Sequence, residues 1–304
     1  MDDKKIPSPS PESIEISRII AGVMSWGSWG AQLDPKSVLT LIENCLEMGI
    51  TTFDHADIYG DYTTEALFGR ATQGSSALRQ RMQLISKCGI KMLTDNRPSH
   101  RIKSYDTSKE HITFSVENSL RQLKTDYLDM LLIHRPSPLM QPEEIAETFT
   151  QLLQSGKVRS VGVSNFTPSQ YDLLNSYIPL SGNQIEASLL HRKPFLDGTL
   201  DQLLKHQHLT MAYSSMAAGA FFAHPPSEAV QRIRFVAGRL ERKHNTTFEQ
   251  ILTAWILRHP AQICPVMGST KVERLQRAVD AQQIDLSREE WFMLWEAAVG
   301  EEVP

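Results

Sequence analysis

The segment TTFDHADIYGD, residues 51–61, places four ionisable groups within six positions of the chain. They are Asp54, His55, Asp57 and Tyr59. β-Branched and aromatic residues lead into them and a glycine follows, which is typical of the end of a β-strand. Carboxylates and imidazoles can bind a metal ion, and together with a phenol they can also donate and accept protons. The segment by itself therefore allows a metal cluster, an acid–base site or a polar loop.

The elements that must position these groups alternate between short apolar runs and helical periods. This alternation predicts βα units around a parallel sheet. The expected strands cover residues 19–24, 50–56, 82–88, 128–134, 157–164, 182–188, 209–214 and 262–268. The expected helices include one from Pro35, capped by Asp34 and ended by Gly49, and others at 65–70, 108–124, 142–154, 227–243, 247–258 and 287–298.

Eight such units predict an α/β fold, a (β/α)8 TIM barrel that forms a single domain over residues 14–304. A doubly wound sheet is the alternative, but it needs a glycine-rich first turn, and the sequence has no G-x-G-x-x-G. Residues 1–13 contain three prolines and are expected to form a flexible N-terminal arm. The charged segment 91–107 is long enough to predict a lid or binding loop.

In a barrel of this kind the carboxyl ends of the strands meet at one mouth, where active sites lie. Polar residues follow most of the expected strands, so we expect them to gather there. They are Asp54, Tyr59, Lys87, His134, Ser164, Asn165, Gln184, Glu186, Tyr213 and Ser214.

Several motifs resemble those of the aldo-keto reductase family, in order, over residues 18–285. They are FDHADIYG, SKCG, LLIHRP, SGKVRSVGVSNF, NQIE, AYS and GSTKVERL. The resemblance implies an NADP-dependent oxidoreductase that reduces aldehyde or ketone carbonyls to alcohols. It also implies that Asp54, Tyr59, Lys87 and His134 are the catalytic residues.

These residue types suit that chemistry. Hydride addition to a carbonyl develops an alkoxide, which needs a proton donor nearby. A free tyrosine has a pKa near 10, so a lysine ammonium beside Tyr59 is expected to lower it, and about two units correspond to about 2.7 kcal/mol. Asp54 would hold Lys87 charged, and His134 would orient the carbonyl oxygen or relay a proton.

The reduction needs a hydride donor, and the sequence lacks the G-x-G-x-x-G motif that commonly binds a dinucleotide. Barrels often hold phosphate with the loops after strands seven and eight, and here Gly268, Ser269 and Thr270 are expected to open the eighth helix, with Lys271 and Arg274 as cationic donors. The resemblance implies that Ser269 and Arg274 bind the adenosine 2′-phosphate, so NADP(H) is favoured and NAD(H) binds more weakly.

The same resemblance also implies which residues bind the nicotinamide end of the cofactor. It implies that Ser164, Asn165 and Gln184 hold the carboxamide and that Tyr213, followed by Ser214, stacks on the ring. The chain departs from the family pattern at Arg277 and Ala278, and in the residues after AYS.

Two tryptophans in SWGSWG, Trp26 and Trp29, are expected to line the substrate pocket after the first strand. Two other functions stay open. A metal-dependent hydrolase would use Asp54, His55, Asp57 and His134, although no His-x-His or His-x-x-x-His pair occurs and Lys87 would repel a cation. A non-catalytic nicotinamide-sensing barrel subunit is the second alternative, suggested by the resemblance.

Composition narrows the partners. The 304 residues are 41% hydrophobic and 22% charged, with a net charge of −4 and a pI near 6.2, which argues against nucleic acid or anionic membrane as a partner. The three cysteines have no metal spacing, and the N-terminus lacks an apolar signal segment. We therefore expect a cytoplasmic monomer or small homo-oligomer that acts on a small-molecule carbonyl and holds no metal.

Overall fold

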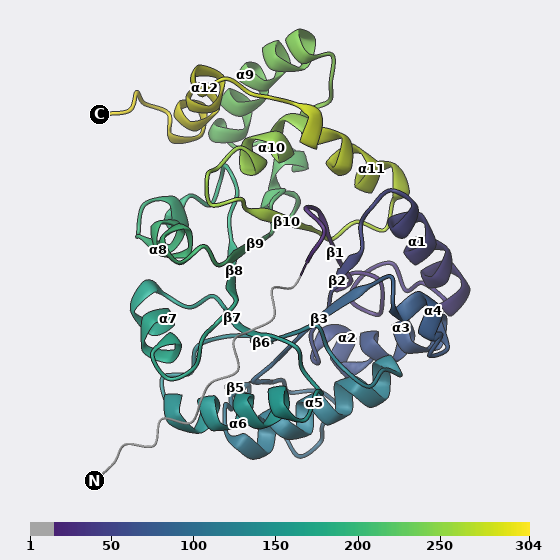
Figure 1. Ribbon diagram of the computed structural model, residues 1–304. Coiled ribbons are helices and arrows are strands. Elements are labelled where there is room, and N and C mark those ends of the chain that lie inside the picture. The colour runs from purple at the N-terminus through teal and green to yellow at the C-terminus, as the bar shows by residue number, and fades with distance from the viewer. Residues whose placement is uncertain (1–14) are drawn as a thin grey trace.

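A closed barrel of eight parallel strands forms the centre of the computed structural model, which describes residues 15–304 (Figure 1). The strands follow one another around the barrel in the order β1-β10-β9-β8-β7-β6-β3-β2. They are β1 (Ile20–Gly22), β2 (Thr52–Asp54), β3 (Gln83–Cys88), β6 (Met130–Ile133), β7 (Val161–Ser164), β8 (Gly182–Glu186), β9 (Leu209–Tyr213) and β10 (Cys264–Met267). The predicted (β/α)8 barrel is confirmed. The predicted arm, residues 1–13, lies outside the described residues.

Helices surround the barrel (Figure 1). The longer ones are α1 (Pro35–Glu47), α3 (Thr64–Thr72), α5 (Lys109–Leu123), α6 (Pro142–Gln154), α7 (Pro168–Asn175), α8 (Thr199–His206), α9 (Glu228–His244), α10 (Phe248–Leu257), α11 (Val272–Asp280) and α12 (Arg288–Val299). Short turns of helix are α2 (Tyr59–Tyr62), α4 (Ser76–Arg79), η1 (Lys193–Phe195), η2 (Ala217–Phe222) and η3 (Ala281–Gln283).

The ends of α1 follow from its sequence. The side chain of Asp34 accepts a hydrogen bond from the backbone nitrogen of Ser37, and Pro35 occupies the first turn. Gly49 lies just beyond the helix with a φ of 84°, a left-handed conformation that glycine adopts without a steric penalty. Both ends were predicted, so the helix begins and ends where its local sequence indicates.

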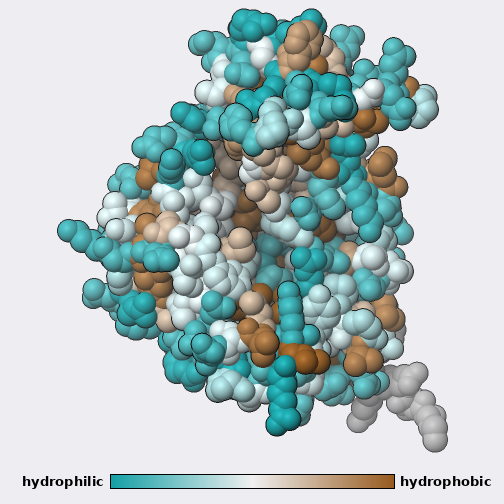
Figure 2. Space-filling view, turned by 180° about the vertical axis from the view of Figure 1, so that it is seen from behind, coloured by the Kyte–Doolittle hydropathy of each residue, from teal (hydrophilic) through white to brown (hydrophobic). Residues whose placement is uncertain are grey.

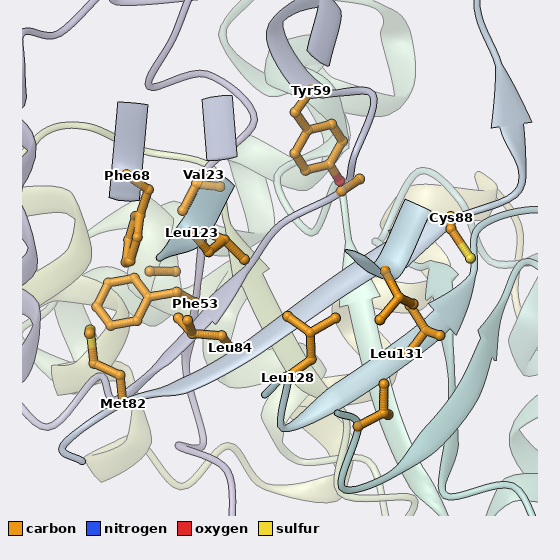
Figure 3. Packing of buried hydrophobic residues seen from close by; sticks show 14 of the residues in the cluster. Val23, Phe53, Tyr59, Phe68, Met82, Leu84, Cys88, Leu123, Leu128 and Leu131 are labelled. Carbon is orange, nitrogen blue, oxygen red and sulfur yellow. The ribbon is translucent and has the colours of Figure 1, made fainter. Parts of the chain in front are cut away.

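The core has an inner part and an outer layer. Inside the barrel lie mainly aliphatic and sulfur-containing side chains, which are Ile20, Ile85, Met130, Leu132, Met211, Cys264 and Val266. Outside it, side chains from the strands pack against the helices, and Figure 3 shows Phe53, Phe68 and Leu84 gathered in this layer, with Tyr59 apart from them in the same cluster. Burial of this apolar surface holds the strand ends in fixed positions.

The segment 91–107 is not an open loop throughout. Its two ends pair as a short antiparallel ribbon of β4 (Ile90–Lys91) and β5 (Ser104–Tyr105). Sequence analysis missed this ribbon because two-residue strands carry no detectable periodicity. The ribbon fixes the segment beside the carboxyl end of β3. A role as a lid or binding loop stays a prediction.

The outer surface mixes residue types. Figure 2 shows hydrophilic and hydrophobic residues interspersed over one face of the molecule. Among residues 15–304, no helix combines the length and the apolar character that crossing a bilayer requires.

Candidate active site

Three ionisable side chains, two from the neighbouring strands β2 and β3 and one from the turn after β2, meet at the carboxyl end of the barrel. The ammonium Nζ of Lys87 lies 2.8 Å from Oδ2 of Asp54 and 2.9 Å from the hydroxyl oxygen of Tyr59. It also donates to the backbone oxygen of His55 at 2.7 Å. All three ammonium protons are therefore used, and the side chains of Lys87 and Asp54 are buried. Sequence analysis predicted this grouping.

A turn after β2 brings Tyr59 back over the strand end. Tyr59 begins α2, and the residues after it, Gly60, Asp61 and Tyr62, have φ values of 59°, 56° and 67°. A Cβ on Gly60 would lie 2.5 Å from Oγ1 of Thr64, so the turn requires glycine there. Left-handed backbone at non-glycine residues is uncommon and is often found at functional sites.

The pKa of Tyr59 does not follow the expectation from sequence. Burial raises it above its ordinary value, whereas the neighbouring Lys87 ammonium acts to lower it. For Lys87 burial acts to lower the pKa, but Asp54 and Tyr59 hold it above the ordinary value. The predicted net lowering of the phenol's pKa is therefore wrong for this structure, because the desolvation cost of a phenolate exceeds the gain from the ammonium.

His134 follows β6 and faces the same group. Its ring centroid lies 6.0 Å from that of Tyr59 in an edge-on arrangement. Its Nδ1 is buried without a hydrogen-bond partner in the described structure. Burial, with Lys87 and Arg135, holds its pKa well below the ordinary value. The imidazole is thus neutral near pH 7 and can donate one ring N–H to an acceptor in the site.

Polar residues of β7, β8 and β9, with Asn165 directly after β7, form one connected network. The Tyr213 hydroxyl donates to Oδ1 of Asn165 at 2.7 Å, and Nδ2 of Asn165 donates to the Ser164 hydroxyl at 2.8 Å. Ser164 in turn donates to the backbone oxygen of Gln184 at 2.9 Å. Asn165 and Ser214 both have left-handed φ values, 63° and 51°. The residues predicted to hold the nicotinamide are thus brought together by three adjacent strands.

The segment from Gly268 to Arg274 follows β10. The prediction that Gly268, Ser269 and Thr270 open the next helix is wrong. α11 starts at Val272 with Lys271 as its N-cap residue, so Gly268, Ser269 and Thr270 form the turn before it. The difference arises because the Ser269 hydroxyl accepts from the backbone nitrogen of Lys271 at 3.1 Å, which closes a local turn ahead of the helix.

This turn presents donors that an anion could use. Arg274 is exposed, and within the described residues it forms no ion pair. Its guanidinium lies 5.9 Å from the ring centroid of Phe222. The hydroxyl of Thr270 and the ammonium of Lys271 lie in the same stretch. This donor set fits a phosphate group.

The two tryptophans of SWGSWG lie in different environments. Trp29 is 37% exposed, its ring centroid is 6.2 Å from that of Tyr59, and its indole nitrogen donates to Oδ2 of Asp61 at 3.1 Å. Trp26 is 1% exposed and packs against Phe53 and Phe68. The prediction that Trp26 lines the substrate pocket is wrong, because core packing takes up its whole side chain.

A second group of buried acids lies behind the strand ends. The pKa of Asp57 is raised to about 8 by burial and by Glu65, and burial raises that of Glu65 to about 7. Glu65 accepts a hydrogen bond from the Ser86 hydroxyl at 2.6 Å. Among residues 15–304, no three His, Cys, Asp or Glu side chains are arranged to hold a metal ion.

Sequence analysis missed two features of this mouth. Arg135, inside the LLIHRP motif, lies with Nη2 3.4 Å from the Tyr213 hydroxyl. The amide nitrogen of Gln184 donates to Oδ1 of Asp54 at 2.7 Å. The position of Arg135 directly after His134 was a usable signal for the first. No local pattern could have shown the second, because the two residues are 130 positions apart.

Comparison with known proteins agrees with this geometry. The pattern of the Aldo/keto reductase family matches residues 18–298. The chain is 44% identical to the uncharacterized oxidoreductase YcsN of Bacillus subtilis, over 96% of this chain and 98% of that protein. It is 40% identical to a 6-dehydroglucose reductase of Agrobacterium fabrum, over 96% and 97%.

A solved structure gives the same result. An aldo/keto reductase from Klebsiella pneumoniae in complex with NADP and acetate superposes with a TM-score of 0.74 at 27% identity, covering 92% of this chain and 90% of that one. The chain therefore belongs to the aldo/keto reductase family of nicotinamide-dependent oxidoreductases.

Proposed function

We propose that this protein reduces aldehyde or ketone carbonyls to alcohols with NADPH. One observation carries the proposal, which is the contact of a buried lysine ammonium with both a carboxylate and a phenol. Lys87 lies within 2.9 Å of Tyr59 and within 2.8 Å of Asp54. A buried ion pair made only for stability does not need a phenol as its third member.

Each residue of the group has a task in this reaction. The nicotinamide, when bound, supplies a hydride to the carbonyl carbon. The hydroxyl of Tyr59 donates its proton to the carbonyl oxygen, and Lys87 stabilises the phenolate that remains. Burial keeps this phenol protonated before the reaction, and the Lys87 ammonium opposes the rise in its pKa by stabilising the phenolate. Asp54 keeps Lys87 charged and in place.

His134 would orient the substrate. Because its pKa is well below the ordinary value, it is neutral and donates a hydrogen bond without delivering a full charge. A donor aimed at the carbonyl oxygen beside Tyr59 stabilises the negative charge that develops there.

The cofactor would lie across the mouth from the nicotinamide network to the turn after β10. Ser164, Asn165 and Gln184 offer amide and hydroxyl groups for the carboxamide, and the ring of Tyr213 offers a surface for stacking. Ser269 and Arg274, with Lys271 beside them, would bind the 2′-phosphate. Because only cationic donors compensate a doubly charged phosphate, NADP(H) should bind more tightly than NAD(H).

The relative from Agrobacterium fabrum is named for a sugar aldehyde as its substrate, so hydroxylated aldehydes belong in the first test. A panel of aldehydes, ketones and quinones, run with NADPH and then with NADH, measures cofactor oxidation. Saturable oxidation of NADPH with at least one carbonyl is the expected result. Tight NADPH binding without any turnover would instead favour a nicotinamide-sensing subunit, and activity lost on dialysis against a chelator would favour a metal enzyme.

A further inference from the structure

Arg135 is a cation at the mouth for which the proposed reaction has no task. It follows His134 directly, it is half-buried, and its guanidinium reaches the Tyr213 hydroxyl at 3.4 Å. Among residues 15–304 it forms no ion pair with a carboxylate. A half-buried guanidinium with a long bond to one neutral hydroxyl has unused donors in a fixed planar arrangement.

The cofactor's phosphates do not account for this charge. The turn that offers donors to phosphate follows β10, and Arg135 follows β6. In the closed barrel three strands separate β6 from β10 in either direction, so the two cations lie on opposite sides of the mouth. Arg135 is instead next to His134 and Tyr213, where the carbonyl substrate and the nicotinamide ring would meet.

A second cation lies on the same side. Lys103 comes just before β5, which pairs with β4 beside the end of β3. Its side chain is exposed, and its charge contributes to the lowered pKa of His134, after burial, Lys87 and Arg135. The β4–β5 ribbon therefore places Lys103 on the side of the mouth where β3 ends, and β3 is the neighbour of β6.

No carboxylate among residues 15–304 forms an ion pair with Arg135 or Lys103, although the charge of Glu186 acts on the neighbouring Tyr213 hydroxyl. Oδ2 of Asp61 accepts from the indole of Trp29, and its backbone oxygen accepts from Asn96. Glu186 is paired in register with Tyr213, but it forms no ion pair with Arg135 in the described structure. Asp54 is already bound to Lys87. Arg135 and Lys103 are thus two cations without an ion-pair partner in the described part of the chain.

We propose that the carbonyl substrate carries a carboxylate, bound by Arg135 and approached by Lys103, so that the enzyme is an oxo-acid reductase. The inference rests on the proposed carbonyl reduction and adds the class of substrate. A guanidinium matches a carboxylate with two parallel hydrogen bonds, and a nearby second cation attracts the anion to the mouth. Carboxylic acids with ordinary pKa values are ionised at pH 7, so the charge is always present.

The test compares oxo-acids with matched neutral amides. Aldehydes of four, five and six carbons that end in a carboxylate are assayed with NADPH beside the same aldehydes that end in an amide. The two series share length and shape and differ in charge. For at least one length, kcat/KM for the acid should exceed that for its amide by about tenfold to a hundredfold, mainly through KM, as expected for one charge-assisted pair.

Variants then locate the recognition. Arg135→Gln and Lys103→Gln should each lower the acid-to-amide ratio of kcat/KM, with the larger effect for Arg135→Gln. Arg101→Gln removes the same charge from an exposed site on segment 91–107 and should leave that ratio unchanged. Because Lys103 is exposed, its variant tests the idea even if Arg135→Gln fails to fold.

Three results would overturn the inference while the proposed function stands. The wild type could reduce amides as well as acids at every length. Arg135→Gln could lower both series equally, which would mean that Arg135 only positions Tyr213. Arg101→Gln could lower the ratio as much as Lys103→Gln, which would indicate a diffuse charge effect. If none of the carbonyl compounds supported NADPH oxidation by the wild type, the proposed function itself would fail.

Discussion

The carboxylate of Asp54 accepts hydrogen bonds from a residue on the neighbouring strand and from one on the opposite side of the barrel. Lys87 donates to Oδ2 at 2.8 Å, and the amide of Gln184 donates to Oδ1 at 2.7 Å. Three strands separate β2 from β8 in either direction, so the second bond crosses the barrel. The group around Lys87 and the network of Ser164, Asn165 and Gln184 are therefore one connected unit.

Replacing Gln184 should disturb both parts of this unit. Gln184→Leu leaves one oxygen of the buried Asp54 without a donor, which should destabilise the fold by about 1–3 kcal/mol. Thermal or urea unfolding measures this loss. Gln276→Leu is a control. It removes an exposed hydrogen bond from the side-chain amide to Asp280 and should change the free energy of unfolding by less than about 0.5 kcal/mol. Equal losses in the two variants would show that the cross-barrel bond is not important for stability.

Tyr59→Phe should retain NADPH binding and lose carbonyl reduction by about 10²- to 10⁴-fold in kcat, because we propose the phenol as the proton donor. Fluorescence titration with NADPH and steady-state turnover measure the two properties. Tyr177→Phe changes an exposed tyrosine in the same way and should keep full activity. Near-normal turnover in Tyr59→Phe would remove the general-acid assignment.

Replacing Lys87 separates stability from catalysis. Lys87→Met leaves Asp54 charged and unpaired in a buried position, which should cost about 3–5 kcal/mol. The double variant Asp54→Asn, Lys87→Met removes both charges and should recover much of that stability but not the activity. Thermal melts and NADPH-oxidation rates for the single and double variants check this. Recovery of activity with stability would show that Tyr59 needs no cationic neighbour.

Arg274→Ala should weaken NADPH far more than NADH. The loss of one charge-assisted contact to the 2′-phosphate is worth about 1.5–3 kcal/mol, or about tenfold to a hundredfold in Kd. Arg239→Ala removes an exposed arginine from α9 and serves as the control. If both cofactors weakened equally, the 2′-phosphate would have to lie elsewhere.

The buried acids Asp57 and Glu65 should make stability depend on pH. Their pKa values, about 8 and about 7, lie above the ordinary 3.8 and 4.5, so the folded state binds more protons than the unfolded state between these limits. Their contribution is therefore full below about pH 4 and is lost as the pH rises towards 8.

Melting temperatures of wild type and of Asp57→Asn between pH 5 and 8 measure this effect. The decrease in melting temperature on raising the pH should be smaller in the variant, because the asparagine amide does not ionise in this range. A decrease of the same size in both proteins would mean that Asp57 is already ionised in the folded state at pH 5.

The sequence by itself determined the architecture and most of the candidate site. The alternation of strand and helix, the cap at Asp34 and the glycine after α1 depend on local physical preferences, which a short stretch of sequence displays. The polar residues at the strand ends were also predictable, because every parallel strand of a barrel delivers its carboxyl end to the same mouth.

Only the tertiary structure decided features that depend on distant neighbours. It separated Trp26 from Trp29, which share one motif, because the packing of Phe53 and Phe68 buries the first and leaves the second beside Tyr59. It also reversed the expected shift in the pKa of Tyr59. Burial, charge pairing and contacts across a barrel depend on residues that are far apart in the chain. A local sequence pattern therefore does not predict them.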